Sequence, residues 1–232
     1  MGKIDYDTVY KEALDSNIKA VREEVLDGNK EMIIKMQNYA EKFNIPYKFL
    51  IHRILQDNLF ANNFAKDPAK QSIHQKTAAA YIESIIDVVN FVQLPAGGKR
   101  ARYIGEDGIM YIGEKKNKGL TKSIDFYWEY DGKQYYAAHK YTKDEGGAQD
   151  NQANDLSSFL KNASKSKLEN TIFLAIGDGA YYQKICESED DGVMRSRIEE
   201  MNHLYRSSSA LAITTDDLEE FLVSNSTNKI ID

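Results

Sequence analysis

The sequence predicts an α/β protein in which a mixed central sheet follows a helical N-terminal region. Three observations predict this fold class. Residues 1–93 carry apolar side chains at the spacing that is typical of amphipathic helices. From residue 102 the chain becomes rich in Tyr, Ile and Gly, and Asp131-Gly132 is a strong hairpin turn signal between two β-type runs. Beyond this hairpin, apolar runs alternate with helical segments, which indicates strands joined through helices.

The first part of the chain is expected to be helical throughout. The apolar spacing predicts helices over residues 4–25, 32–43, 47–60 and 74–93. Turn-forming residues separate them, and the segment Leu94-Pro95-Ala96-Gly97-Gly98 ends the last one. We therefore expect a helical N-terminal region over residues 1–73 and a core domain over residues 74–232.

The core domain is expected to supply the sheet. β-type runs predict strands over residues 109–112, 123–130, 134–142, 171–176 and 210–214. The run 171–176 is unbroken and apolar, which is typical of a central strand covered on both faces. Helices are expected over residues 149–163, 193–205 and 216–223. Cys186 is also expected on a helix. The tetrapeptide YIGE occurs at 103–106 and 111–114, which suggests a hairpin.

Composition excludes several classes of protein. With 42% hydrophobic and 28% charged residues among 232, the chain is globular and not disordered. A single cysteine excludes a disulfide framework and a cysteine-based zinc cluster. No apolar run approaches the roughly 18 residues that a membrane span needs, and the start has no apolar stretch typical of a secretory signal. We expect a soluble protein of a reducing compartment, the cytoplasm, with no membrane partner.

Charge is unevenly distributed along the chain. The formal net charge is −6, yet residues 61–122 carry 10 basic against 6 acidic side chains, while residues 167–232 carry 6 against 13. A basic middle beside an acidic tail is what an anion-binding face would produce. A chance excess on a solvated loop explains the charge alone equally well.

The predicted hairpin carries an acid and a lysine. Asp125 lies near the start of its first strand, and Lys140 lies near the end of its second. Because side chains alternate along a strand, Ala138 and Lys140 share one face, whereas His139 points to the other face and is expected to be packed or hydrogen-bonded there. Trp128 is expected in the core. The simpler alternative is that Asp125 and Lys140 form a surface cross-strand pair.

Two flanking segments add to this pattern. Gly146-Gly147 opens a helix whose first turns are rich in amides and acids, an arrangement that presents hydrogen-bonding groups in one place. These polar residues are Gln149, Asp150, Asn151, Gln152 and Asn154. Upstream, the Gly-containing segment with Lys99, Arg100 and Arg102 is suited to contact a phosphate backbone.

These residues resemble the PD-(D/E)XK nuclease superfamily, and most closely the type II restriction endonucleases. In that family an Asp near the start of one hairpin strand and an acid-X-Lys triplet on the next form the site. Asp125 is similar to the first Asp, Lys140 resembles the lysine, and Ala138 stands where the second carboxylate belongs. The resemblance covers roughly residues 74–176, and it implies a restriction-endonuclease-like fold.

The resemblance implies a Mg²⁺-dependent, sequence-specific endonuclease that acts on double-stranded DNA. Asp125, an acid at 138 and the backbone carbonyl of His139 would hold Mg²⁺, which would activate a water, and Lys140 would position that water or stabilise the phosphate charge. Glu83 is a further candidate acid, although a solvated helix residue is the simpler interpretation. Asn and Gln suit adenine edges and Asp suits cytosine, so the five polar residues at the helix start are candidate base readers, while Lys99, Arg100 and Arg102 would contact phosphates.

Ala138 is the departure from the family pattern, because a methyl group cannot ligate a metal. Three explanations compete. The chain is an engineered, inactivated form; the acid has migrated to Glu129, Asp144 or Glu145; or the chain is a natural non-cleaving relative. The retained Lys140 favours the first explanation. Two other functions stay open: a non-cleaving DNA-binding protein, and a repair or antiphage nuclease without site specificity.

The expected reaction also predicts an assembly. Cutting both strands of a symmetric site calls for two related active sites, which a two-fold homodimer supplies. Residues 1–73 exceed what a minimal core needs, so we expect part of them at the dimer interface or clamped on DNA.

Overall fold

The computed structural model describes residues 4–113, 120–143 and 147–226. The chain divides into two compact units, residues 5–77 and the residues from 78 onward. The boundary expected from the sequence lies between residues 73 and 74. Among the helices described, none is both long and apolar enough to span a bilayer.

The first unit is helical, as predicted. It contains α1 (Tyr6–Leu26), α2 (Lys30–Lys42), α3 (Tyr47–Gln56), α4 (Asn58–Asn62) and a 3₁₀ turn, Pro68–Gln71. The helix predicted over residues 47–60 is divided at Asp57, whose extended backbone ends α3 and whose carboxylate accepts the N–H of Leu59 to cap α4. The core of this unit is formed by apolar side chains from all four helices, among them Ile18, Val21, Met36, Leu50, Ile54 and Ala61.

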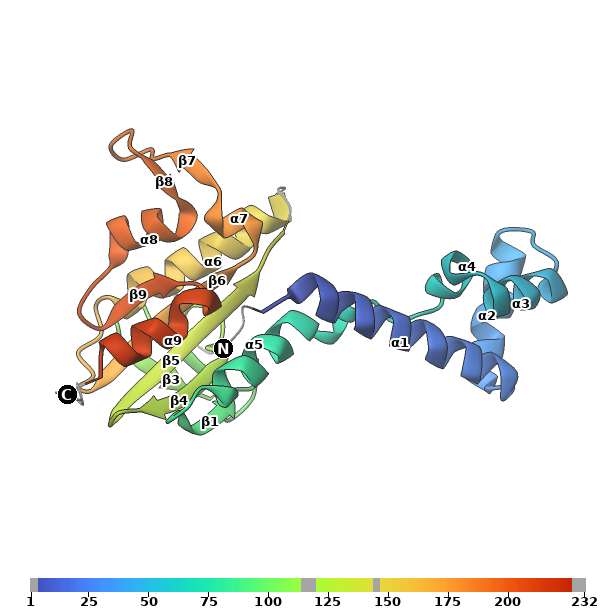
Figure 1. The fold of residues 1–232 in the computed structure, drawn as a ribbon, viewed down its shortest axis with the longest axis horizontal. Coiled ribbons are helices and arrows are strands. Elements are labelled where there is room, and N and C mark those ends of the chain that lie inside the picture. The colour runs from blue at the N-terminus through green and yellow to red at the C-terminus, as the bar shows by residue number, and fades with distance from the viewer. Residues whose placement is uncertain (1–3, 114–119, 144–146, 227–232) are drawn as a thin grey trace. The chain divides into compact units, whose positions relative to one another are not determined.

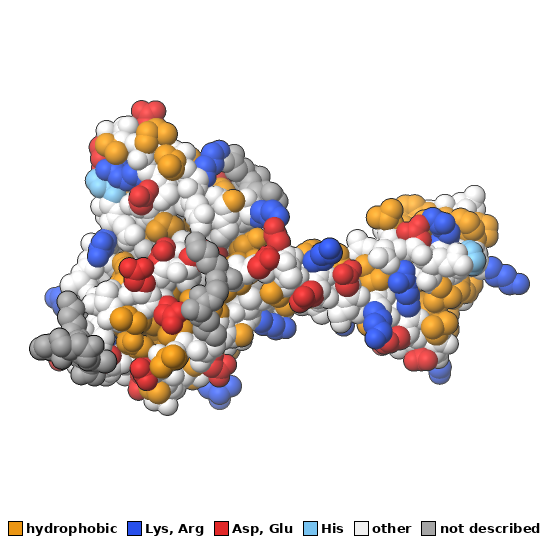
Figure 2. Space-filling view, in the orientation of Figure 1, with side chains coloured by type: hydrophobic (Ala, Val, Ile, Leu, Met, Phe, Trp, Pro, Cys, Tyr) orange, Lys and Arg blue, Asp and Glu red, His pale blue; other side chains and the backbone are white. Residues whose placement is uncertain are grey.

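Large apolar side chains also lie on the surface of the helical unit (Figure 2). They are Leu26, Ile34, Phe43, Phe49 and Leu59, each at least half exposed. An exposed set of this kind is a feature of surfaces that contact a partner.

The second unit contains a five-stranded mixed sheet in the order β1 (Val89–Gln93), β4 (Phe126–Tyr130), β5 (Lys133–Tyr141), β6 (Thr171–Asp178) and β9 (Ala210–Ile213) (Figure 1). β1 pairs with β4 and β4 with β5 in antiparallel register. β5 pairs with β6 and β6 with β9 in parallel register. The predicted mixed α/β sheet, with an antiparallel hairpin and helix-connected strands, is therefore confirmed.

Helices cover both faces of the sheet (Figure 1). On one face, which we call the α6 face, α6 (Gly147–Ala163) packs Leu156 and Phe159 against Phe173 of β6, and α8 (Arg197–Tyr205) adds Met201. On the opposite face, which we call the α9 face, α5 (Ile73–Ser84) and α9 (Thr215–Ser224) cover Trp128 and Leu174. Trp128 is fully buried, as predicted.

The prediction of one helix over residues 74–93 was wrong. Helix α5 ends at Ser84, and Val89–Gln93 forms β1 at the edge of the sheet. Asp87 and Asn90 have left-handed backbone angles, φ +67° and φ +53°, which interrupt a helix. The β-branched residues of this segment favour a strand when β4 is available as a hydrogen-bonding neighbour.

Two smaller elements also differ from the prediction. Met194–Ser196 forms β8, which pairs with β7 (Ile185–Glu187), and α8 begins only at Arg197. Ser196 and Glu199 form a reciprocal capping box that fixes this start. Cys186 therefore lies on a strand and not on a helix. The YIGE hairpin is confirmed as β2 (Arg102–Ile104) paired with β3 (Met110–Ile112).

Candidate active site

The alternation of side chains is interrupted at Asp125. Ile124 packs on the α6 face, whereas Phe126, two residues later, packs on the α9 face. The backbone N–H of Asp125 donates to Ala137 on β5, and its carbonyl accepts the N–H of Leu94, at the end of β1. The backbone of Asp125 thus bridges β5 and the end of β1.

The carboxylate of Asp125 reaches across to β5. Its Oδ2 accepts the backbone N–H of His139 at 2.8 Å. The side chain of Asp125 therefore lies beside β5 at His139, the residue between Ala138 and Lys140. A charge-assisted bond to a backbone N–H fixes a carboxylate more firmly than a neutral contact does. The structure brings Asp125 to the strand that carries Ala138 and Lys140.

Ala138 lies in a row of small side chains across the α6 face. It is opposite Ala175 of β6, which is opposite Ala212 of β9, and all three are in the same apolar cluster. Asp125 supplies one carboxylate, and the methyl group of Ala138 supplies no oxygen ligand. The predicted Mg²⁺ centre needs more oxygen ligands than this one carboxylate provides. Among the side chains that the structure describes, no three His, Cys, Asp or Glu residues form a group that could hold a metal ion.

The possible substitutes for the missing acid are only partly described. Glu129 lies on β4, where its carboxylate accepts hydrogen bonds from the Tyr127 hydroxyl and from Asn90 Nδ2. These hydrogen bonds hold the pKa of Glu129 below its ordinary value. Burial of the Tyr127 hydroxyl, together with its hydrogen bond to Glu129, raises the pKa of Tyr127 to about 12. Asp144 and Glu145 lie outside the described residues.

Lys140 is half-buried near the end of β5. Strand alternation directs it to the α6 face, as it does Tyr136 and Ala138. Its register partner on β6 is Gly177. A Cβ at Gly177 would lie 2.7 Å from the ring of Tyr182, so the absence of a side chain there makes room for this buried aromatic ring.

The start of α6 is joined to residues that follow β5 and β6 in the chain. Thr142 Oγ1, just after β5, donates to Gln152 Oε1 at 3.1 Å, and the Tyr181 hydroxyl donates to Asp150 Oδ1 at 2.5 Å. Asn151 and Asn154 are exposed. The side chain of Gln149 lies outside the described residues. Two of the five predicted base readers thus also make contacts within the chain.

The predicted phosphate-binding residues occupy different environments. Lys99 and Arg100 are exposed in the loop before β2. Arg102 is half-buried on β2, where its guanidinium donates to the Tyr136 hydroxyl at 2.6 Å and lies over the rings of Tyr127 and Tyr136. Arg102 is thus a fixed side chain, and the other two belong to a solvated loop.

Glu83 lies away from the α6 face. It is exposed on α5, and the buried residues of that helix, Ala78, Ala79 and Ile82, pack on the α9 face. The structure therefore places Glu83 on the helix that covers the face opposite Ala138 and Lys140.

His139 takes part in a buried polar network whose other members, Asp178 and Thr215, the sequence pattern does not predict. Its Nε2 lies 3.0 Å from Asp178 Oδ2, and both side chains are almost fully buried. Asp178 Oδ1 accepts the backbone N–H of Thr215 at 2.8 Å and its hydroxyl at 3.1 Å. The prediction that His139 is hydrogen-bonded on the face away from Lys140 is confirmed. An aspartate at the end of a buried strand, in Gly177-Asp178-Gly179, was the available signal.

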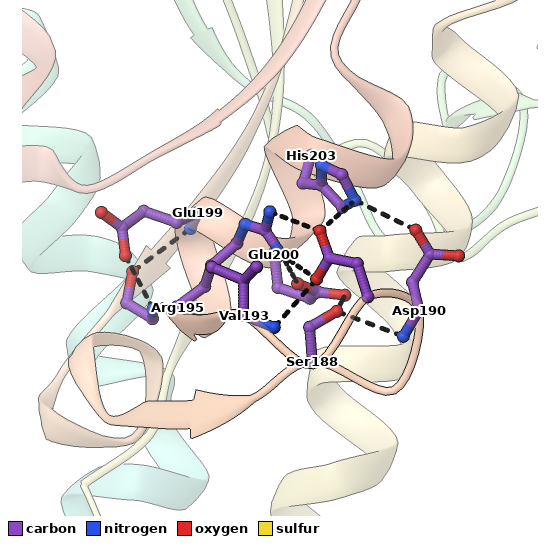
Figure 3. Close-up of polar contacts among 9 residues, drawn as sticks. Ser188, Asp190, Val193, Arg195, Glu199, Glu200 and His203 are labelled. Atoms are coloured by element: carbon purple, nitrogen blue, oxygen red, sulfur yellow. Dashed lines mark hydrogen bonds and ion pairs between the residues drawn. The ribbon is translucent and has the colours of Figure 1, made fainter.

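A second polar cluster lies at the β7–β8 hairpin (Figure 3). Arg195 makes a two-pronged contact with Asp191 at 2.7 and 2.8 Å, and His203 Nε2 lies 3.1 Å from Asp190. The hydrogen bonds that Asp191 accepts from Arg195 and from the N–H of Val193 hold the pKa of Asp191 well below its ordinary value. The acids of this hairpin are thus engaged by cations of the same chain, which indicates a structural role.

Comparisons with known proteins do not add to these observations. No protein-family model matches the chain, and no curated protein or solved structure matches it. The case for a function therefore depends on the geometry at Asp125, Ala138 and Lys140 and on the basic segment beside it.

Proposed function

We propose that this chain is a DNA endonuclease of the PD-(D/E)XK type, most similar to type II restriction enzymes, in which Ala138 replaces the second metal-binding carboxylate. In the form described it binds double-stranded DNA and does not cut it. The observation that carries the proposal is the Asp125 carboxylate, held on β5 by the N–H of His139 between Ala138 and Lys140.

The fold around this carboxylate supports the proposal. Asp125 directly precedes β4 of the β4–β5 hairpin, and Lys140 lies on β5, which runs parallel to β6 and is followed by α6. This is the order of elements that the resemblance implies. The cations Lys99, Arg100 and Arg102 lie on the segment that hydrogen-bonds to Ile124, next to Asp125, where a DNA backbone would need to lie.

Ala138 explains why binding and cutting are separated. The residues present do not supply the two carboxylates that a Mg²⁺ centre of this family uses. A glutamate at 138 would add the missing oxygen ligand and a negative charge next to Asp125. Lys140 would then lie on the same face as that charge, where it can orient a water or stabilise the phosphate.

The test is Ala138→Glu, with Ala138→Gln as the matched control of equal size and no charge. We expect Ala138→Glu to cut plasmid DNA in Mg²⁺ by orders of magnitude faster than the unmodified chain, and Ala138→Gln to stay inactive. Lys140→Ala in the Ala138→Glu background should abolish cutting again. Mg²⁺ should also raise the melting temperature of Ala138→Glu alone, because a ligand that binds only the folded state stabilises it.

Each pattern of products has a distinct meaning. Discrete bands indicate a site-specific enzyme, and a smear indicates the nonspecific nuclease. If Ala138→Glu folds, binds DNA and stays inert on many substrates, the chain is a non-cleaving DNA-binding protein. Brisk cutting by the unmodified chain would show that another acid supplies the ligand, with Glu145, which follows β5 in the sequence, as the first candidate.

We further propose that the active form is a homodimer. The exposed apolar side chains of the helical unit, such as Phe43, Phe49 and Leu59, support a protein contact there. Analytical ultracentrifugation with and without DNA tests this, and a monomer at micromolar concentration in both states would contradict it.

A further inference from the structure

A small pocket lies beside Asp125 in the sheet unit. Its volume is about 230 Å³, and it is lined by apolar side chains, by Gln93 and by three cations. The apolar walls are Val92, Leu94, Pro95 and Ile112, and the cations are Lys99, Arg100 and Arg102. A site built from both kinds of side chain suits a ligand that has an apolar part and an anionic part.

The pocket adjoins the candidate active site through the backbone. The N–H of Leu94, on its wall, donates to the carbonyl of Asp125 at 2.8 Å. The carbonyl of Arg102, on another wall, accepts the N–H of Ile124 at 2.8 Å. Two wall residues of the pocket are thus hydrogen-bonded through their backbones to Asp125 and to the residue before it.

Arg102 is oriented before any ligand binds. Its guanidinium lies 5.5 Å from the ring centre of Tyr127 and 5.3 Å from that of Tyr136. One of its five N–H donors goes to the Tyr136 hydroxyl, and a guanidinium is planar, so its remaining donors and its flat face are held in a fixed direction. This is a way to recognise a planar, hydrogen-bonding group, whereas the exposed Lys99 and Arg100 suit phosphates.

We propose that this pocket holds one nucleotide of bound DNA with its base out of the helical stack, the base lying against Arg102 and the apolar walls and its phosphates near Lys99 and Arg100. The inference rests on the proposed function, because DNA is the ligand that brings a nucleotide to this place. The volume is below the roughly 300–1,000 Å³ of pockets for whole small-molecule ligands, which fits a single unit of a longer chain.

The test uses the unmodified chain and two DNA duplexes of about 30 base pairs and equal sequence, one of which has a single unpaired thymidine inserted in its centre. Removing a base from the stack costs free energy, and this cost is smallest for an unpaired base. Fluorescence anisotropy without divalent cations should therefore show about tenfold or more tighter binding to the bulged duplex.

Variants that fill the pocket separate this effect from charge. Val92→Trp and Ile112→Trp replace wall residues that are 45% and 66% exposed, so the fold tolerates the added bulk. Each should reduce the preference for the bulged duplex to less than about twofold, chiefly by weakening binding to the bulged duplex. Val89→Trp, the same change on the same strand outside the pocket walls, should keep the full preference.

The outcomes distinguish this inference from the proposed function. Binding to both duplexes with equal affinity overturns the nucleotide pocket and leaves the DNA-binding proposal standing. Binding to neither duplex overturns both. If thymidine monophosphate raises the melting temperature of the chain and not of Val92→Trp, while no bulge preference exists, the pocket takes a free nucleotide and the DNA version is wrong.

Discussion

Asp178 is the residue whose removal should destabilise the sheet unit most clearly. It is almost fully buried and accepts at least three hydrogen bonds, one from His139 and two from Thr215. The N–H of Thr215 belongs to the first turn of α9, so the carboxylate also supplies a negative charge where a helix favours it.

The size of the effect follows from these contacts. A hydrogen bond to a charged group contributes about 1.5–3 kcal/mol, and donors that are left buried and unpaired add a penalty. Such contributions do not add fully, and breaking a buried pair typically costs about 3–5 kcal/mol. We therefore expect Asp178→Ala to lower the free energy of unfolding by about 3–5 kcal/mol. Asp178→Asn keeps an acceptor for Thr215 and should lower it by about 1–2 kcal/mol.

Urea unfolding followed by tryptophan fluorescence measures this effect in the intact chain. The sequence has a single tryptophan, Trp128, in the core of the sheet unit, so its emission reports on that unit. Asp217→Ala is the control, since it removes one bond from Thr214 at the exposed side of the same helix start and should cost about 0.5–1 kcal/mol. A loss below about 1 kcal/mol for Asp178→Ala, with an unchanged dependence on urea, would refute the reasoning.

Three further predictions concern other parts of the sheet unit. The Tyr135 hydroxyl is buried without a hydrogen-bond partner among the described residues, so Tyr135→Phe should raise the free energy of unfolding by about 1 kcal/mol. Burial raises the pKa of Tyr135 to about 12. The contribution of the neutral hydroxyl to the free energy of unfolding is therefore fully present below pH 10 and is lost as the pH rises through about 12. The alkaline unfolding curves of the unmodified chain and of Tyr135→Phe should differ in that window. The pKa of Asp191 is lowered by Arg195, so its contribution is present above about pH 4 and is lost as the pH falls further, which the NMR signal of the Val193 amide should report. Arg100→Ala should weaken binding to all DNA sequences alike and reduce the salt dependence by about one phosphate contact, and a sequence-selective loss would assign it to base reading instead.

The fold was predictable where a local signal and the tertiary environment agree. The turn at Asp131-Gly132 and the apolar runs that form β6 and β9 were predictable for this reason. The strand over residues 89–93 was not predictable, because the apolar spacing of this segment fits a helix and only its pairing with β4 makes it a strand.

The candidate site was predictable in part for the same reason. Strand alternation correctly separated His139 from Ala138, because it depends only on the sequence positions. The reach of Asp125 to the N–H of His139 depends on a break in alternation that no local pattern announces. The side-chain partner of His139, Asp178, lies 39 residues further along the chain, so no spacing rule could join the two.

The two edges of the sheet limit how copies of this chain can associate. β9 has four residues, and β1 has a register shift between Val89 and Val92 with Asn90 in the left-handed region. Short or irregular edge strands are poor templates for adding a further strand. We therefore expect that a homodimer does not form by extending the sheet from one copy to the next, and that its contacts are made by side chains. The same edges should protect the chain from strand-to-strand aggregation at high concentration.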